Sequence, residues 1–139
     1  MNSLFIDSDI IIDLLARREN YIEAAALMTI IAEKKVDAFT TPIVLADVDY
    51  IITKYSSKAK SRRAIKSLRK NLSILPMDEK IVDTALESEF SDFEDAMQHY
   101  AAEKYGIDFI VTRNKKDYVK GSIKVVTAKE YIDMHEVNE

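Results

Sequence analysis

The chain has 139 residues, of which 47% are hydrophobic and 32% charged, enough apolar side chain for the core of one globular domain over residues 1–139. The absence of cysteine excludes disulfide bonds and thiolate metal sites, and with only two histidines any metal ion would be held mainly by oxygen. No apolar run approaches the roughly 18 residues that a membrane span needs, and no basic segment precedes the first apolar stretch, so we expect a cytoplasmic protein.

Charge is distributed unevenly along the chain. Twenty basic and 24 acidic side chains give a formal net charge of −4. No Asp or Glu occurs from Tyr50 to Met77, yet eight basic residues fall there, which leaves 12 basic and 24 acidic side chains in the remainder. A basic segment is often a solvated helix face, but on an acidic protein it is also suited to RNA phosphates or to an acidic segment of a partner protein.

Strands and helices alternate along the chain. Short apolar runs predict strands at Leu4–Ile6, Val36–Phe39, Leu72–Leu75, Phe109–Val111 and Ile123–Val126. Helical periodicity and capping residues predict helices through Ile10 to Leu15, at Tyr21–Lys34, from Pro42 to about Lys54, at Lys58–Lys70, Glu79–Glu87 and Phe93–Tyr105, and after Thr127. This alternation is typical of an α/β protein, and we expect a three-layer α/β/α sandwich with a mainly parallel central sheet.

Polar residues follow two of the predicted strands directly. Asp7 comes after the first strand, and Thr112, Arg113 and Asn114 come after the fourth. In open parallel sheets, ligands bind beyond the carboxyl ends of the strands, at the point where the strand order reverses. These residues are therefore candidates for a site, although position alone is equally consistent with Asp7 as a helix cap.

Two predicted helices carry further acidic candidates. Asp47 lies at the edge of the apolar face of the helix that starts at Pro42, whereas Asp49 lies on the far side. A carboxylate that faces inward is costly unless a cation or hydrogen bonds meet it. Asp95 lies in the first turn of its helix, where the helix dipole alone explains an acid, and shares a stripe with His99, for which a plain core imidazole is the commoner role.

The candidate acids come from separate elements that the crevice of such a fold can gather. They are Asp7, Asp47, Asp95 and Asp117. Four carboxylates that converge without a cation would repel one another and raise one another's pKa. With Mg²⁺ or Mn²⁺ they would form a hard-oxygen site suited to phosphodiester substrates.

The chain resembles the PIN domain family, the fold of many small metal-dependent ribonucleases and of the VapC-like toxins of toxin–antitoxin pairs. The matching segments are FIDSDIIIDLL at 5–15, TPIVLADVDYII at 41–52 and DFEDAMQHYAAEKYGIDFIVTRNKKDY at 92–118, in this order. Two positions depart from the family pattern: Asp47 stands where Glu is common, and Asp9 stands where many members have Asn.

The resemblance implies a metal-dependent endoribonuclease that hydrolyses RNA phosphodiester bonds, with a small antitoxin protein as a partner and a homodimer as the expected assembly. It implies that the catalytic residues, which would also bind Mg²⁺ or Mn²⁺, are Asp7, Asp47, Asp95 and Asp117. By the same resemblance, the residues that would contact the substrate are Thr112, Arg113 and Asn114.

Two other interpretations stay open at this point. The segment FIDSDI also resembles the Asp-x-Asp opening of haloacid dehalogenase-like phosphatases, in which Asp7 would be the nucleophile and Asp9 the acid or base, but the Gly-Thr that usually follows is missing. Alternatively, the domain has a PIN-like shape, is catalytically inactive and binds another protein. An aspartyl phosphate on Asp7 would favour the first alternative, and metal binding without cleavage of any RNA would favour the second.

Overall fold

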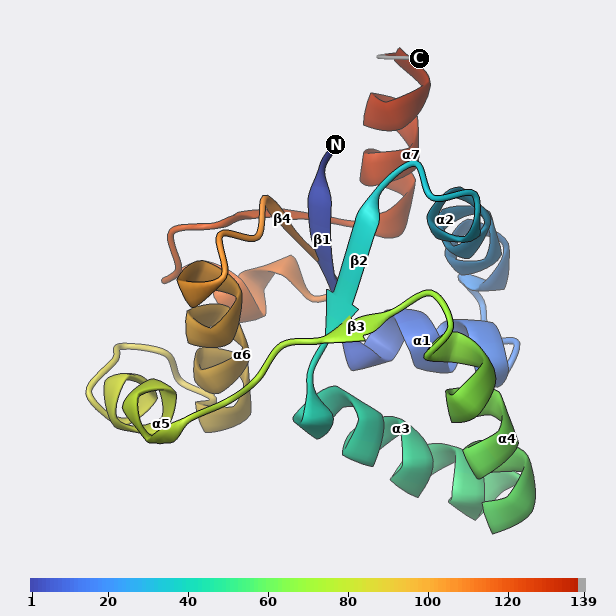
Figure 1. Cartoon of the computed structure of the whole chain (residues 1–139), viewed down its shortest axis with the longest axis horizontal. Coiled ribbons are helices and arrows are strands. Elements are labelled where there is room, and N and C mark those ends of the chain that lie inside the picture. Colours follow the sequence, from blue (N-terminus) through green and yellow to red (C-terminus); the bar gives the residue numbers. More distant parts are fainter. Residues whose placement is uncertain (138–139) are drawn as a thin grey trace.

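The computed structural model describes residues 1–137, within which five parallel strands form one sheet (Figure 1). The strand order is β3-β2-β1-β4-β5. The strands are β1 (Ser3–Ile6), β2 (Asp37–Thr40), β3 (Ser73–Ile74), β4 (Phe109–Val111) and β5 (Lys124–Val126). The strand order reverses between β1 and β4, so the carboxyl ends of these two strands define the crevice in which ligands bind in such sheets.

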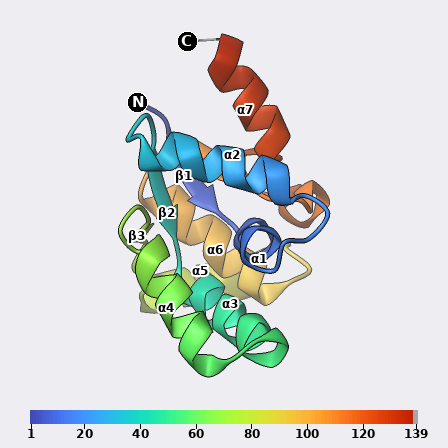
Figure 2. The same cartoon turned by 90° about the vertical axis from the view of Figure 1, so that its right-hand side faces the viewer.

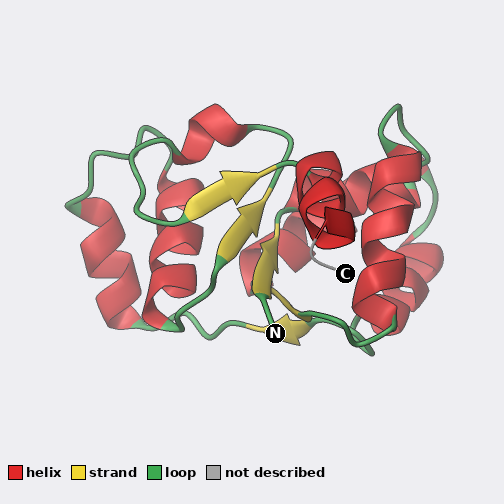
Figure 3. Cartoon of the chain, turned by 90° about the horizontal axis from the view of Figure 1, so that it is seen from above, coloured by secondary structure: helices red, strands yellow, loops and turns green. Residues whose placement is uncertain are grey.

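Helices cover both faces of the sheet. They are α1 (Ser8–Leu15), α2 (Tyr21–Ala32), α3 (Pro42–Tyr55), α4 (Lys58–Leu68), α5 (Glu79–Leu86), α6 (Phe93–Lys104) and α7 (Ala128–Val137), with a short 3₁₀ helix η1 (Lys115–Tyr118). The chain moves from β1 to β3 and then returns to the other side of β1, so right-handed connections place α5 and α6 on the face opposite the earlier helices. Figures 1 and 3 show helices on both sides of the strands, which confirms the predicted three-layer α/β/α class with a wholly parallel sheet.

The central strand and the helix caps follow directly from the sequence. Leu4, Phe5 and Ile6 are fully buried, because β1 has a strand on each side and a helix layer on each face. Thr41 caps α3 by accepting a hydrogen bond from the Val44 amide at 3.2 Å. Since α3 starts where β2 ends and packs against α1, this cap fixes the helix that carries Asp47 near the carboxyl edge of the sheet.

Element boundaries differ from the prediction mainly at the edges. β3 is shorter than the predicted strand because it pairs only with β2, although Leu75 still donates its amide proton to the Thr40 carbonyl at 2.8 Å. The polar segment after β4 contains η1. α4 ends before Lys70 and runs beside α3 (Figure 2). Within residues 1–137, no helix has both the length and the apolar character that crossing a membrane requires.

Candidate active site

Asp7 lies at the junction of β1 and α1, at the point where the strand order reverses. Its amide still pairs with the Val111 carbonyl at 3.1 Å, so the end of β4 fixes the backbone here. The side chain is only 8% exposed. Its Oδ1 accepts a hydrogen bond from the Ser8 amide at 2.8 Å, and its Oδ2 lies 3.0 Å from the hydroxyls of Thr112 and Tyr118. The carboxylate is thus held in one orientation from three directions.

Asp9, whose role the sequence left open, fixes the turn after β4. Its Oδ2 accepts hydrogen bonds from the Arg113 amide at 3.0 Å and from the Asn114 side chain at 3.3 Å. The same oxygen lies 3.0 Å from the Thr112 hydroxyl, whose single proton therefore serves either Asp9 or Asp7. The other oxygen of Asp9 is buried without a hydrogen-bond partner. Asp9 therefore ties α1 to the turn that follows β4.

Asp95 on α6 completes an electrostatic group with Asp7 and Asp117. Burial, followed by the charge of Asp9, raises the pKa of Asp7 to about 6. Burial, and then the charges of Asp92, Asp7 and Asp117, raise the pKa of Asp95 to about 7. Acids from β1, α6 and η1 are therefore close enough to disfavour one another's ionisation, as the sequence predicted for converging carboxylates.

Asp47 reaches the same region from α3, where it is half-buried. Its neighbour is Glu94 on α6, an acid that sequence reasoning missed. Burial raises the pKa of Glu94, and the charge of Asp47 and a hydrogen bond with it raise it further, with a smaller contribution from Asp7. The position of Glu94 beside Asp95 in the first turn of α6 was the available signal. The structure thus brings the four predicted acids and Glu94 into one region.

The chemistry of these donors fits a hard divalent cation such as Mg²⁺ or Mn²⁺. All of them are oxygens, and carboxylates that raise one another's pKa gain most from a bound positive charge. The buried, unpartnered Oδ1 of Asp9 lies next to this group in sequence and offers a further acceptor. No three acidic or histidine side chains of residues 1–137 stand at the spacing of a preformed metal site. An ion would therefore have to draw the carboxylates together or bind partly through water, as Mg²⁺ commonly does.

The structure changes the roles predicted for the turn after β4. Thr112 is fully buried, and its hydroxyl is hydrogen-bonded to the carboxylates of Asp7 and Asp9. It therefore has no exposed surface for the predicted substrate contact. Arg113 donates from Nε to Asp13 at 2.8 Å, and Asp13 on α1 is 1% exposed. The guanidinium is therefore anchored on a buried carboxylate through Nε, while the side chain stays 38% exposed. Asn114 is exposed, with its amide directed at Asp9. This turn mainly holds the acids in place.

Tyr118 and Gln98 belong to the site and were missed from the sequence. The Tyr118 hydroxyl donates to Asp7 at 3.0 Å and accepts from Gln98 Nε2 at 3.2 Å. Burial, and then the charges of Asp7 and Asp95, hold the pKa of Tyr118 far above its usual range, so the hydroxyl remains a donor. A hydrogen bond from Tyr118 also lowers the pKa of Asp95, which places the hydroxyl between the two acids. Their positions, directly after Asp117 and one turn after Asp95, were the available signals.

His99 is a core imidazole. It is 1% exposed, its ring centroid lies 5.2 Å from that of Phe90, and burial lowers its pKa. Gly121 packs directly on it, since a Cβ there would lie 2.5 Å from the imidazole ring. The helix face that His99 shares with Asp95 therefore serves mainly to pack α6 against the core.

The phosphatase interpretation does not suit the geometry of Asp7. A nucleophilic carboxylate needs an oxygen that is free to attack, yet both oxygens of Asp7 accept hydrogen bonds and the side chain is almost wholly buried. The proposed acid or base, Asp9, is committed to the turn after β4.

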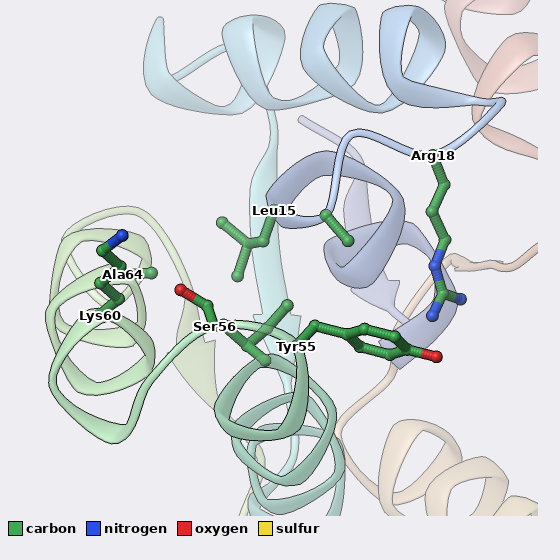
Figure 4. Close-up of a pocket in the computed structure, with 8 residues that line it drawn as sticks. Leu15, Arg18, Tyr55, Ser56, Lys60 and Ala64 are labelled. Atoms are coloured by element: carbon green, nitrogen blue, oxygen red, sulfur yellow. The ribbon is translucent and has the colours of Figure 1, made fainter.

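One well-formed cavity lies away from the acids. It has a volume of about 520 Å³ and lies between the end of α1, the end of α3 and α4. Figure 4 shows Leu15 and Ser56 between Arg18 and Tyr55 on one side and Lys60 and Ala64 on the other. Tyr55 is 69% exposed. The cavity therefore combines apolar lining, an exposed aromatic ring and two cationic side chains.

Comparisons with known proteins agree with this fold. The chain is 30% identical over 141 residues to Ribonuclease VapC1 of Aquifex aeolicus, a match that covers 96% of each chain. The structure of FitAcB from Neisseria gonorrhoeae is similar with a TM-score of 0.71 at 16% identity, over 91% of this chain and 98% of that one. A toxin-antitoxin complex from Klebsiella pneumoniae gives a TM-score of 0.67 at 24% identity, over 90% of this chain and 97% of that one.

A family model matches the segment that contains every candidate acid except Asp117. The model describes the PIN domain and matches residues 3–116, most of the described chain and every strand but β5; Asp117 follows the matched segment directly. The parallel sheet, the acids at its carboxyl edge and this match lead to one conclusion: the chain belongs to the PIN domain family.

Proposed function

We propose that the protein is an endoribonuclease that hydrolyses RNA phosphodiester bonds with Mg²⁺ or Mn²⁺ bound by Asp7, Asp47, Asp95 and Asp117. The observation that carries this proposal is the raised pKa of both Asp7 and Asp95, acids that β1 and α6 bring together where the strand order reverses. The similarity to a relative named as a ribonuclease supports RNA as the substrate.

A divalent ion held by these carboxylates would bind the scissile phosphate and lower the pKa of a water molecule. The chain's own residues supply orientation. Ser8, Thr112 and Tyr118 hold the Asp7 carboxylate, and Asp9 holds the turn after β4. Asn114 is exposed, and its side-chain amide has a second N–H besides the one directed at Asp9, which is available to the substrate.

Cleavage of RNA tests the proposal. The purified protein should cleave an RNA oligonucleotide with Mn²⁺ or Mg²⁺ and lose this activity in EDTA. Asp95→Asn removes one charge from the acid group and should abolish cleavage, whereas Asp37→Asn, at the opposite ends of the strands, should retain it. Equal activity of Asp95→Asn and the parent, or full activity in EDTA, contradicts the proposal, and metal binding without any cleavage favours a binding module instead.

We further propose that a small antitoxin protein binds the cavity between α1, α3 and α4 with an acidic, partly apolar segment. One solved structure with this fold is described as a toxin-antitoxin complex, and Arg18 and Lys60 provide charge complementary to an acidic segment. The protein encoded immediately upstream is the one to co-express. The double variant Arg18→Glu, Lys60→Glu should release it, while Lys80→Glu on α5 should not. Equal binding by both variants contradicts the placement.

A further inference from the structure

A chain of buried hydrogen bonds runs from α3 through α6 and η1 to Asp7. The Thr41 hydroxyl donates to Gln98 Oε1 at 2.9 Å, Gln98 Nε2 donates to the Tyr118 hydroxyl at 3.2 Å, and that hydroxyl donates to Asp7 Oδ2 at 3.0 Å. Thr41, Gln98 and Tyr118 are at most 3% exposed. Water therefore has little access to replace any of these bonds.

All hydrogen bonds in this network run in the same direction, toward Asp7. It begins at the Val44 amide, which donates to Thr41, and each later side chain accepts from one neighbour and donates to the next. Asp7 is the final acceptor and has no proton to pass on when it is ionised. In a buried network of this kind each bond polarises the next, and loss of one member leaves the others unpaired.

The members of the chain come from the elements that carry the candidate acids. Thr41 caps the helix of Asp47, Gln98 follows Asp95 by one turn on α6, and Tyr118 follows Asp117 in η1. A single set of hydrogen bonds therefore links Asp7 to the elements that carry the other three acids.

We infer that Tyr118 is a positioning residue of the candidate site, whose hydroxyl, itself held by Gln98, fixes the Asp7 carboxylate relative to α6 and α3. Thr112 bonds Asp7 from the end of β4, so it does not link the carboxylate to α6 or α3. The Ser8 amide binds the other oxygen and belongs to the same segment as Asp7, so it does not tie Asp7 to another element. The expected effect of Tyr118 on metal binding rests on the proposed function. Its effect on the orientation of the Asp7 carboxylate does not.

The test compares two matched variants. Tyr118→Phe removes only the hydroxyl, and the control Tyr131→Phe removes the hydroxyl of an equally buried tyrosine on α7 that accepts from Asn2 at 3.0 Å. In metal-free protein, NMR coupling constants should show one χ1 rotamer of Asp7 in the parent and in Tyr131→Phe, and an average of rotamers in Tyr118→Phe. Calorimetry should show Mn²⁺ binding to Tyr118→Phe weakened roughly 10- to 100-fold, the usual effect of removing a group that orients a metal ligand.

Gln98→Leu removes the hydrogen bond from Gln98 to the Tyr118 hydroxyl. It replaces Tyr118→Phe as the test variant if Tyr118→Phe fails to fold. It should also release the Asp7 rotamer, and the double variant should bind Mn²⁺ no more weakly than Tyr118→Phe, because Gln98 acts through Tyr118. A single Asp7 rotamer in both variants overturns the inference, whatever happens to metal binding. If the parent binds no Mn²⁺, the proposed function fails, and the rotamer comparison still decides the role of Tyr118.

Discussion

Asp7 and Asp95 are acids that weaken the metal-free fold at neutral pH. Their folded-state pKa values, about 6 and about 7, lie above the ordinary value of 3.8, so between these values the folded protein binds more protons than the unfolded chain. The stability that they contribute is present at low pH and is lost as the pH rises through 6 and 7. For Asp7 alone, the difference between the folded-state pKa and the ordinary pKa corresponds to a loss of roughly 3 kcal/mol in the free energy of unfolding.

Asp95→Asn should therefore stabilise the metal-free protein at pH 8 while it removes activity. The amide keeps the shape of the side chain and removes the repulsion from Asp7, Asp92 and Asp117. Urea unfolding should show a larger gain at pH 8 than at pH 5, because the folded parent keeps the proton of Asp95 at pH 5 and has lost it at pH 8. Asp37→Asn is the control, and an equal effect at both pH values would contradict the assigned repulsion.

Arg113 should matter for stability through Asp13. Arg113→Ala leaves a carboxylate that is 1% exposed without its ion-pair partner, which typically costs about 3 kcal/mol or more. Arg62→Ala is the matched control, because its partner Asp49 lies in a more exposed pair. Chemical denaturation measures both. If the two variants lose the same free energy of unfolding, the Arg113–Asp13 pair has no special structural role, and the predicted substrate contact of Arg113 deserves new tests.

At the scale of elements, β1, β4 and the caps of α3, α5 and α6 were predictable because each depends on neighbouring residues. Thr41, Asp78 and Asp92 accept from amides three residues ahead, a local pattern that the sequence displays. Tyr118, Gln98 and Glu94 lie close to predicted acids in the sequence, but their contacts arise only when η1, α6 and α3 pack together. Asp9 was visible as an unusual residue, but its partners lie about a hundred positions away in the chain.

The helix α4 offers a basic face for RNA. Arg63 and Lys66 on α4 and Lys70 just after it are exposed, whereas Arg62 is paired with Asp49 and Arg69 donates to the Leu72 carbonyl. Replacing the three exposed residues by Ala should weaken RNA binding and lower the slope of log affinity against log salt concentration by roughly 0.7 for each lost phosphate contact.

The control for α4 replaces Lys80, Lys124 and Lys129, which changes the net charge equally on other elements. Fluorescence anisotropy over a salt series gives both slopes. Mn²⁺ binding should be the same in both triple variants, since the acids lie elsewhere. An unchanged slope in the α4 variant would mean that the face serves another partner.

At the scale of the whole molecule, the α/β/α class and the order of the elements followed from alternating strands and helices, but the convergence of the acids depends on the strand order, which local patterns do not encode. Because a cation would bind the folded state and relieve its repulsion, Mn²⁺ at a hundredfold excess over Kd should add about 2.7 kcal/mol to the free energy of unfolding. The melting temperature should rise with Mn²⁺ and return to its starting value with EDTA. No response in the parent would contradict a metal site in the folded protein.

The most direct measurement of the central claim is calorimetric titration of Mn²⁺ at pH 8 into the parent, into Asp7→Asn, Asp47→Asn, Asp95→Asn and Asp117→Asn, and into Asp37→Asn as control. If carboxylates from β1, α3, α6 and η1 share one cation site, the parent and the control bind alike and each of the four site variants binds more weakly, with Asp7→Asn and Asp95→Asn weakest. Absence of binding by the parent, or equal affinity in all six proteins, would contradict the account.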